Sequence, residues 1–180
     1  MTPVLSWKKL ALGCLLMLAA GCKPSPGPYQ TAFASLVARA YRVVLVEHSH
    51  WYDDLYSDVG YWSQHDAELS ALPEIVYRSL ELNTQQKQQL IGTVASTDPK
   101  SSGIASACTF EAHHRLEFYI AGKRVNQVEI CFQCGDIQWQ SAIGEAEPDA
   151  MIKSLDNFVN SVGFPPKRDW VKLVETARSK

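Results

Sequence analysis

Several signatures that would assign a function are missing from this chain of 180 residues. No basic run exceeds a pair and the formal net charge is −2, so the sequence has no electrostatic footprint for a nucleic-acid backbone. The motifs G-x-S-x-G, G-x-x-x-x-G-K and H-E-x-x-H do not occur, which leaves their catalytic mechanisms without support. We therefore expect no nucleic-acid partner, assign no catalytic residue and favour a non-enzymatic role.

Long hydrophobic runs are also scarce. The stretch Leu10–Ala20 is apolar or small throughout, but it is too short to span a bilayer core of about 30 Å. Lys8 and Lys9 precede it, which is the order typical of a signal peptide. The stretch leads into Leu18-Ala19-Ala20-Gly21-Cys22, which resembles the lipobox of bacterial lipoproteins. This resemblance implies that Cys22 is acylated, with a fatty acid such as palmitate, and becomes the first mature residue.

The predicted leader sets the organisation of the chain. We expect a lipoprotein signal peptide over 1–21, a lipidated cysteine with a proline-rich tether over 22–28, and a single domain over 29–180. Three prolines after the cysteine favour an extended tether. The lipoprotein resemblance implies a membrane partner through the lipid anchor. Because Lys23 rather than aspartate follows the cysteine, it also implies the bacterial outer membrane, facing the periplasm.

Hydrophobic periodicity predicts an α+β domain. Helical spacing is found over 29–40, after Asn83, over 151–162 and over 170–177, and strand patterns are found over 43–46, 115–120, 127–132 and 137–139. The segment 48–65 has neither period and predicts a long irregular surface segment, and 98–106 has the composition of a loop. We therefore predict a small antiparallel sheet, built from an N-terminal strand, a hairpin and a third strand, with helices on one face.

Three cysteines of the predicted domain form the main chemical constellation: Cys108, Cys131 and Cys134. Three is an odd number, so a disulfide between two of these cysteines would leave the third as a thiol. Alternatively, three thiolates and the imidazole of His113 would complete a tetrahedral zinc site. Both alternatives remain open at this point. A bond between Cys131 and Cys134 would close a tight ring, so the disulfide alternative favours Cys108 as one partner.

Hairpin geometry predicts that these residues can meet. Both strands carry their apolar residues at even positions, so a loop with an odd number of residues is required to keep paired side chains on one face. A loop of residues 121–123 places His113 opposite Cys131, and the alternative, which pairs Ala121 with Val125, places the two residues diagonally on the same face. His114 falls on the apolar face and is kept as a substitute ligand.

The same region resembles a known pattern. Its residues are Cys108-Thr109-Phe110-Glu111-Ala112-His113-His114, Phe118-Tyr119, Gly122-Lys123 and Glu129-Ile130-Cys131-Phe132-Gln133-Cys134. They resemble a widespread family of uncharacterised bacterial proteins, many of them lipoproteins, with a cysteine and histidine stretch, a Phe-Tyr strand, a Gly-Lys turn and a Cys-Phe-x-Cys strand. Counting from Cys108 favours His113 as the matching histidine, and counting back from Phe118-Tyr119 favours His114. The family brings no activity with it.

A second candidate site lies in the segment that follows the first strand. His48 and His50 share one face of an extended chain, and Asp53, Asp54, His65 and Asp66 lie nearby in the sequence. These side chains could bind a metal ion; the alternative is that the segment is a solvated loop. The aromatic residues of this segment are Trp51, Tyr52, Tyr56, Tyr61 and Trp62. Trp51, Tyr56 and Trp62 are candidate binding residues for a sugar or an envelope polymer, with packing at the rim of the core as the alternative.

Two functions remain from the sequence. The first is a lipid-anchored envelope protein with a structural or sensing Cys/His metal site, for which zinc is the expected metal. The second is an envelope binding module that uses the aromatic segment and has a structural disulfide. A thiol–disulfide enzyme ranks third, because Gly135-Asp136 leads into a strand and not into the helix whose N-terminus would activate a thiol.

Overall fold

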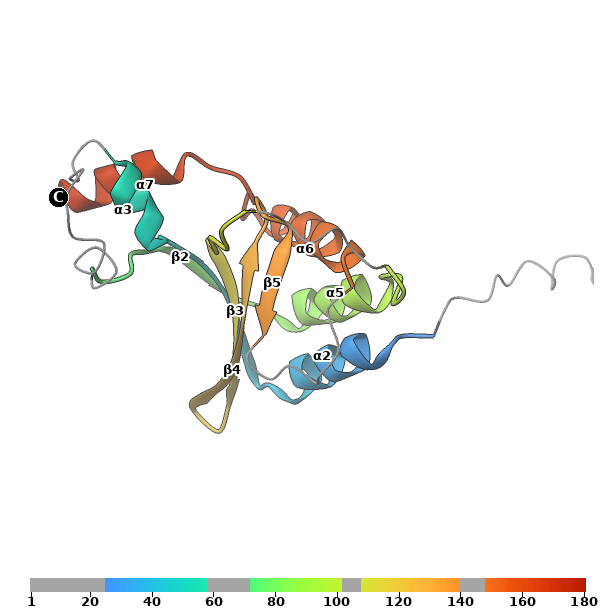
Figure 1. Cartoon of the computed structure of the whole chain (residues 1–180). Coiled ribbons are helices and arrows are strands. Elements are labelled where there is room, and N and C mark those ends of the chain that lie inside the picture. Colours follow the sequence, from blue (N-terminus) through green and yellow to red (C-terminus); the bar gives the residue numbers. More distant parts are fainter. Residues whose placement is uncertain (1–24, 58–71, 102–107, 140–147) are drawn as a thin grey trace, which may run out of the picture.

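A five-stranded antiparallel sheet, in the order β2-β1-β3-β4-β5, is the centre of the computed structural model (Figure 1). The structure describes residues 25–57, 72–101, 108–139 and 148–180. The elements are α2 (Pro28–Arg39), β1 (Arg42–His48), α3 (Trp51–Tyr56), β2 (Val76–Glu81), α5 (Thr84–Ala95), β3 (His114–Ile120), β4 (Lys123–Cys131), β5 (Asp136–Trp139), α6 (Ala150–Ser161) and α7 (Trp170–Arg178). The predicted α+β class is therefore confirmed.

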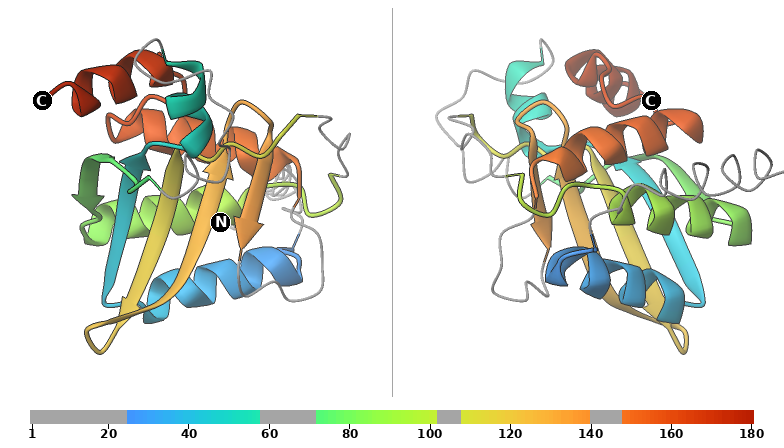
Figure 2. Two further views of the ribbon diagram at one scale, coloured as in Figure 1. Left: turned by 60° about the vertical axis from the view of Figure 1, so that its left-hand side comes forward. Right: turned by 90° about the vertical axis from the view of Figure 1, so that its right-hand side faces the viewer.

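The hydrophobic core lies between one face of the sheet and the helices α2, α5 and α6, which run along that face (Figure 2). Phe33 of α2, Leu90 of α5 and Leu155 of α6 are fully buried there. Burial of each such side chain stabilises the fold by about 1.5–3 kcal/mol. The short helices α3 and α7 contact each other beyond one end of the sheet, so the described residues leave the opposite face of the sheet largely uncovered.

The helix α5 begins as its sequence predicts. The Asn83 side chain accepts a hydrogen bond from the Gln86 amide at 2.9 Å, and the Gln86 side chain accepts one from the Asn83 amide at 2.9 Å. This reciprocal capping box satisfies two donors that the first turn of a helix leaves open. Within the described part of the chain, no helix is both long and apolar enough to cross a membrane.

The β3–β4 hairpin confirms the predicted pairing of the strands but not the predicted loop. His114 pairs with Ile130, the register that places residue 113 opposite 131. The loop is Ala121-Gly122, with φ of 49° and 81°, so the prediction of a three-residue loop over 121–123 is wrong. Positive φ at both positions is what a two-residue hairpin turn of type I′ requires. A β-bulge at Val125 inserts one residue into β4 and restores the alternation that the apolar pattern demands.

Two elements depart from the prediction. The edge strand β2 makes the sheet five-stranded instead of four-stranded, and its weak pattern reflects a strand whose Val76 is 51% exposed. The segment expected to be irregular over 48–65 contains α3, which begins at a cap formed by His50 and Asp53. Positions 58–71, with Tyr61, Trp62, His65 and Asp66, lie outside the described residues, as do 102–107. The same holds for 1–24, which contain the predicted leader and Cys22.

Candidate functional site

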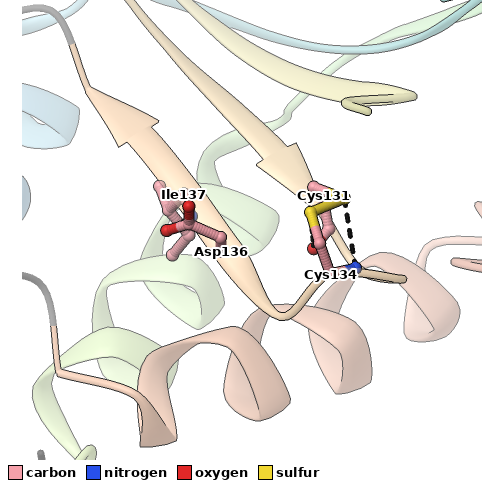
Figure 3. Close-up of a disulfide and its surroundings, with 4 residues drawn as sticks. All are labelled: Cys131, Cys134, Asp136 and Ile137. Carbon is pink, nitrogen blue, oxygen red and sulfur yellow. Dashed lines mark hydrogen bonds between the residues drawn. A yellow bond between two sulfur atoms is a disulfide. The ribbon is translucent and has the colours of Figure 1, made fainter. Parts of the chain in front are cut away.

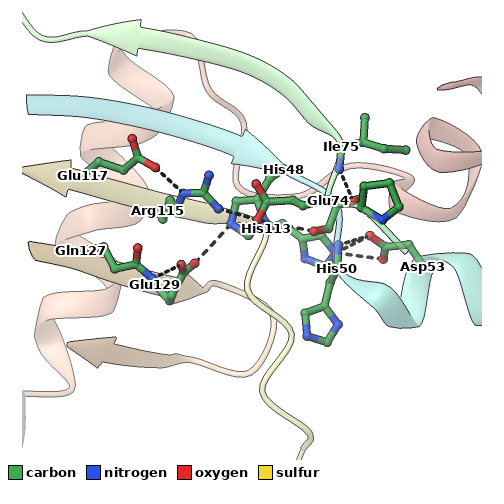
Figure 4. A network of polar contacts seen from close by, with 12 residues as sticks. His48, His50, Asp53, Glu74, Ile75, His113, Arg115, Glu117, Gln127 and Glu129 are labelled. Carbon is green, nitrogen blue, oxygen red and sulfur yellow. Dashed lines mark hydrogen bonds and ion pairs between the residues drawn. The ribbon is translucent and has the colours of Figure 1, made fainter. Parts of the chain in front are cut away.

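The uncovered face of the sheet carries charged and polar side chains (Figure 4). Because side chains alternate along a strand, Arg115 and Glu117 of β3 point away from the helices while their neighbours enter the core. Glu117 accepts hydrogen bonds from Arg115 at 2.9 Å, Tyr119 at 2.7 Å and Arg124 at 2.8 Å. Burial would raise the pKa of Glu117, but these hydrogen bonds, first from Tyr119 and then from Arg115, lower it overall.

A cavity of about 350 Å³ opens at the end of this face that lies beside α3 and α7. This volume is near the lower end of the range for small-molecule pockets, about 300–1,000 Å³. The cavity combines two aromatic side chains, Trp51 and Phe110, with ionisable groups from five separate parts of the fold. The lining residues that matter for its chemistry are His48, His50, Trp51, Glu74, Glu129 and Arg178.

His48 is held by acceptors on both sides of its ring. Its Nε2 lies 3.2 Å from a carboxylate oxygen of Glu129, and its Nδ1 lies 3.0 Å from the carbonyl oxygen of Ser49. Both neighbours are hydrogen-bond acceptors, so the ring of His48 is fixed between the side chain of Glu129 and the backbone of Ser49 at the cavity wall.

The other charged lining groups are also paired. Arg178 donates two hydrogen bonds to Asp54, at 2.9 and 3.0 Å, and joins α7 to α3. The hydrogen bond to Asp54 is the main reason why the pKa of Arg178 is raised. Glu74 accepts a hydrogen bond from Arg115. Arg178 and Glu74 therefore each already have a partner of opposite charge.

His50 contributes a neutral donor. Burial, and then the nearby His113, lower the pKa of His50, so its ring is uncharged at neutral pH. Its Nδ1 accepts a hydrogen bond from the Tyr52 amide at 3.4 Å, which leaves the proton of the neutral ring on Nε2. The ring also stacks on Tyr52, with centroids 5.5 Å apart.

His113, the preferred zinc ligand of the sequence prediction, faces a carboxylate. Its Nε2 lies 2.9 Å from one oxygen of Asp53 and 3.1 Å from the other, and its ring lies parallel to Trp170 at 4.3 Å. Asp53 also accepts a hydrogen bond from the His50 amide at 2.7 Å. His113 therefore fixes the start of α3 against β3 and does not face the cysteines.

His114 belongs to the core, as its parity predicts. It is fully buried, and neither ring nitrogen has a hydrogen-bond partner among the described residues. Burial, and then the adjacent His113, lower its pKa to about 3. Its neutral ring packs edge-on against Phe132 and Trp170. Because His114 lies on the core face of the sheet, it does not reach a metal site on the polar face.

Cys131 and Cys134 form a disulfide, with their Cα atoms 5.4 Å apart (Figure 3). The expectation that Cys108 is one partner of a disulfide is therefore wrong. Cys131 pairs with Asp136 across β4 and β5, so the chain reverses within four intervening residues, and Gly135 allows this with φ of 70°. The sequence disfavoured this bond because it closes a tight ring, and in the structure that ring is the turn between β4 and β5.

The three cysteines still come together. Cys108 is exposed and lines, with Cys131 and Cys134, a cavity of about 40 Å³. The sulfur atoms of Cys131 and Cys134 are bonded to each other and His113 faces Asp53, so this arrangement does not fit a Cys₃His zinc shell. Across the described ranges, no group of three or more His, Cys, Asp or Glu side chains has the geometry to hold a metal ion. Zinc stays a prediction.

Reduction of the Cys131–Cys134 disulfide is expected to destabilise the domain. The ring is short, so the cross-link should contribute about 2 kcal/mol to the free energy of unfolding. Cys131→Ser should lower the melting temperature by about 4–8 °C, and reductant should do the same to the wild type. Cys108→Ser is the matched control and should melt as the wild type does. A wild type that responds to a chelator and not to reductant would instead favour zinc.

The aromatic candidates divide into three cases. Trp51 lines the large cavity and stacks on Tyr52 at 3.8 Å. Tyr56 is 60% exposed on α3 and does not line the cavity. Trp62 lies outside the described residues.

Sequence reasoning missed several residues of the cavity, chiefly Glu74, Glu129 and Arg178. The alternation of β4 could have placed Glu129 on the polar face. Nothing in the sequence brings Arg178, near the end of the chain, to α3. Comparisons with models of protein families, with curated proteins and with solved structures found no match.

Proposed function

We propose that this chain is a lipid-anchored binding module of the bacterial cell envelope, which holds a neutral ligand rich in hydroxyl groups. A ligand of one or two sugar rings suits the cavity volume of about 350 Å³. The observation that carries the proposal is the combination of aromatic side chains with polar groups that already have partners in that cavity. The cell-envelope location rests on the predicted lipoprotein leader.

The pairing of charges favours a neutral ligand. Glu129 faces His48, Glu74 accepts from Arg115, and Asp54 is held by Arg178. An anionic or cationic ligand would have to break one of these pairs and leave its partner uncompensated, which is costly away from water. Hydroxyl groups avoid this cost, because they donate to a carboxylate that keeps its existing ion pair.

The lining residues supply complementary roles. The carboxylates of Glu129 and Glu74 accept hydrogen bonds from hydroxyl groups, whereas the neutral His50 donates from Nε2. Trp51 offers a ring to the apolar C–H face of a sugar. Its stacking on Tyr52 holds it in place before a ligand arrives, which reduces the entropy lost on binding.

The proposal predicts saturable binding of a neutral disaccharide to the full chain in detergent. The probe is diacetylchitobiose, measured by isothermal titration calorimetry. Trp51→Ala and Glu129→Gln should each weaken binding about tenfold or more, the loss expected for one buried stacking or charged hydrogen-bonding contact. Tyr56→Ala is the matched control, because it removes an exposed aromatic from the same helix outside the cavity.

Three outcomes decide the proposal. Binding that is lost in Trp51→Ala and kept in Tyr56→Ala supports it. Equal affinity in both variants, or no saturable binding by the wild type, contradicts it. The affinity for cellobiose, which lacks the acetamido groups, then shows whether binding requires those groups. The affinity for glucosamine, which is positively charged, shows whether binding requires a neutral ligand.

A further inference from the structure

The three cysteines lie around a cavity that is too small for an organic ligand. Its volume is about 40 Å³, room for no more than a few water molecules. Cys108 reaches it from the segment before β3, whereas Cys131 and Cys134 reach it from the turn between β4 and β5. The shared wall places a third cysteine beside an existing disulfide, which is the arrangement that thiol–disulfide exchange requires.

We propose that Cys108 exchanges with the Cys131–Cys134 disulfide, so that the protein interconverts between two disulfide pairings. The Cys108 thiol loses its proton to water, and the resulting thiolate attacks the sulfur of Cys134. A bond forms between Cys108 and Cys134 as the Cys131–Cys134 bond breaks, and the electron pair passes to Cys131. Cys131 then takes up a proton. One disulfide and one thiol exist before and after the step, so no oxidant or reductant is consumed.

Two observations favour Cys134 as the sulfur under attack. Both residues are buried, and Cys134, at 6% exposed, lies nearer the surface than Cys131, at 1%. The Cys134 amide also donates a hydrogen bond to the sulfur of Cys131 at 3.1 Å (Figure 3). A donor at that sulfur stabilises the thiolate that leaves, and a better leaving thiolate speeds exchange.

Exchange would relocate the cross-link. In the observed pairing the disulfide closes the turn between β4 and β5. In the alternative pairing it would tie that turn to the segment that enters β3. This segment carries Phe110 and Ala112, two residues in the wall of the large cavity. The disulfide pairing would therefore affect the position of that wall. This inference does not depend on the proposed sugar ligand.

The test maps disulfides in the full wild-type chain, purified in detergent without reductant. The protein is held in mildly alkaline buffer at several dilutions, quenched with acid, digested and analysed by mass spectrometry without reduction. We expect a peptide linked through Cys108 and Cys134, in a fraction that does not change with dilution, because the step is intramolecular. The linked peptide should be lost entirely in Cys108→Ser.

A second variant keeps the test informative if exchange is slow. Cys131→Ser removes the competing bond, and in a buffer of reduced and oxidised glutathione, which supplies the oxidant, it should form the Cys108–Cys134 disulfide. Cys134→Ser in the same buffer should form a Cys108–Cys131 disulfide to a severalfold smaller extent, because Cys131 is the more deeply buried residue. Wild type with only the Cys131–Cys134 link, together with Cys131→Ser that carries only glutathione adducts, would overturn the proposal.

Discussion

Cys22→Ser is expected to abolish fatty-acid labelling of the chain in bacteria. The predicted leader places Cys22 at the cleavage point, where acylation would make it the membrane anchor. Stable anchoring takes more than one acyl chain, each contributing about 0.8 kcal/mol per buried CH₂, so loss of the lipid should leave no comparable attachment. The measurement is incorporation of an azide-labelled palmitate, detected on the purified chain.

The leader offers its own control for this experiment. Cys14 lies inside the apolar run that should be removed with the signal peptide, so Cys14→Ser should keep the full label. The mature wild type should also begin at Cys22 by mass. A wild-type chain that takes up no label, or a label that persists in Cys22→Ser, would contradict the lipid anchor and the envelope location that depends on it.

Glu47→Ala is expected to destabilise the sheet markedly. Glu47 is fully buried at the end of β1, where it accepts hydrogen bonds from Arg78 at 2.7 Å and from Arg168 at 2.9 and 3.0 Å. It thus joins β1, β2 and the segment before α7. The variant loses hydrogen bonds between charged groups, and because Arg78 and Arg168 keep 41% and 30% of their side chains exposed, the expected loss is about 2–3 kcal/mol.

Thermal unfolding measures this prediction. A loss of about 2–3 kcal/mol corresponds to a melting temperature lower by about 4–12 °C for a domain of this size. Glu81→Ala, at the exposed end of β2, is the matched control and should change the melting temperature by about 1 °C or less. Equal melting temperatures for the two variants would show that the Glu47 cluster does not hold the sheet to α7.

The elements that the sequence predicts are those whose burial produces a regular pattern. The hairpin strands alternate strictly because one face enters the core, and α5 carries its capping box within four residues. β2 escapes prediction because an edge strand with exposed side chains has little alternation to read. The helix α3 escapes because it is one and a half turns long and is fixed by His113, which is distant in sequence.

The candidate site is less predictable for the same physical reason. Segment 48–54 stands out by its histidines and aromatic residues, and it does supply one side of the cavity. The other sides come from Glu74, Glu129 and Arg178, which meet it only through tertiary contacts. The spacing of the cysteines also led to the wrong expectation that Cys108 is one partner of a disulfide. A ring of Cys131–Cys134 looks strained in an extended strand, but it fits a turn that already brings the two Cα atoms to 5.4 Å.

Location of a ligand in the cavity is the most direct test of the proposed function. Chemical-shift mapping of the isotope-labelled full chain, titrated with diacetylchitobiose, reports every backbone amide that the ligand affects. The proposal predicts saturable shifts confined to the cavity wall, at Ser49, Trp51, Glu74 and Glu129, with no change at Glu117 or Arg124 on the far part of the open face. A titration that shifts the Glu117 region instead, or that shifts no amide at all, would contradict a sugar-binding cavity at this end of the sheet.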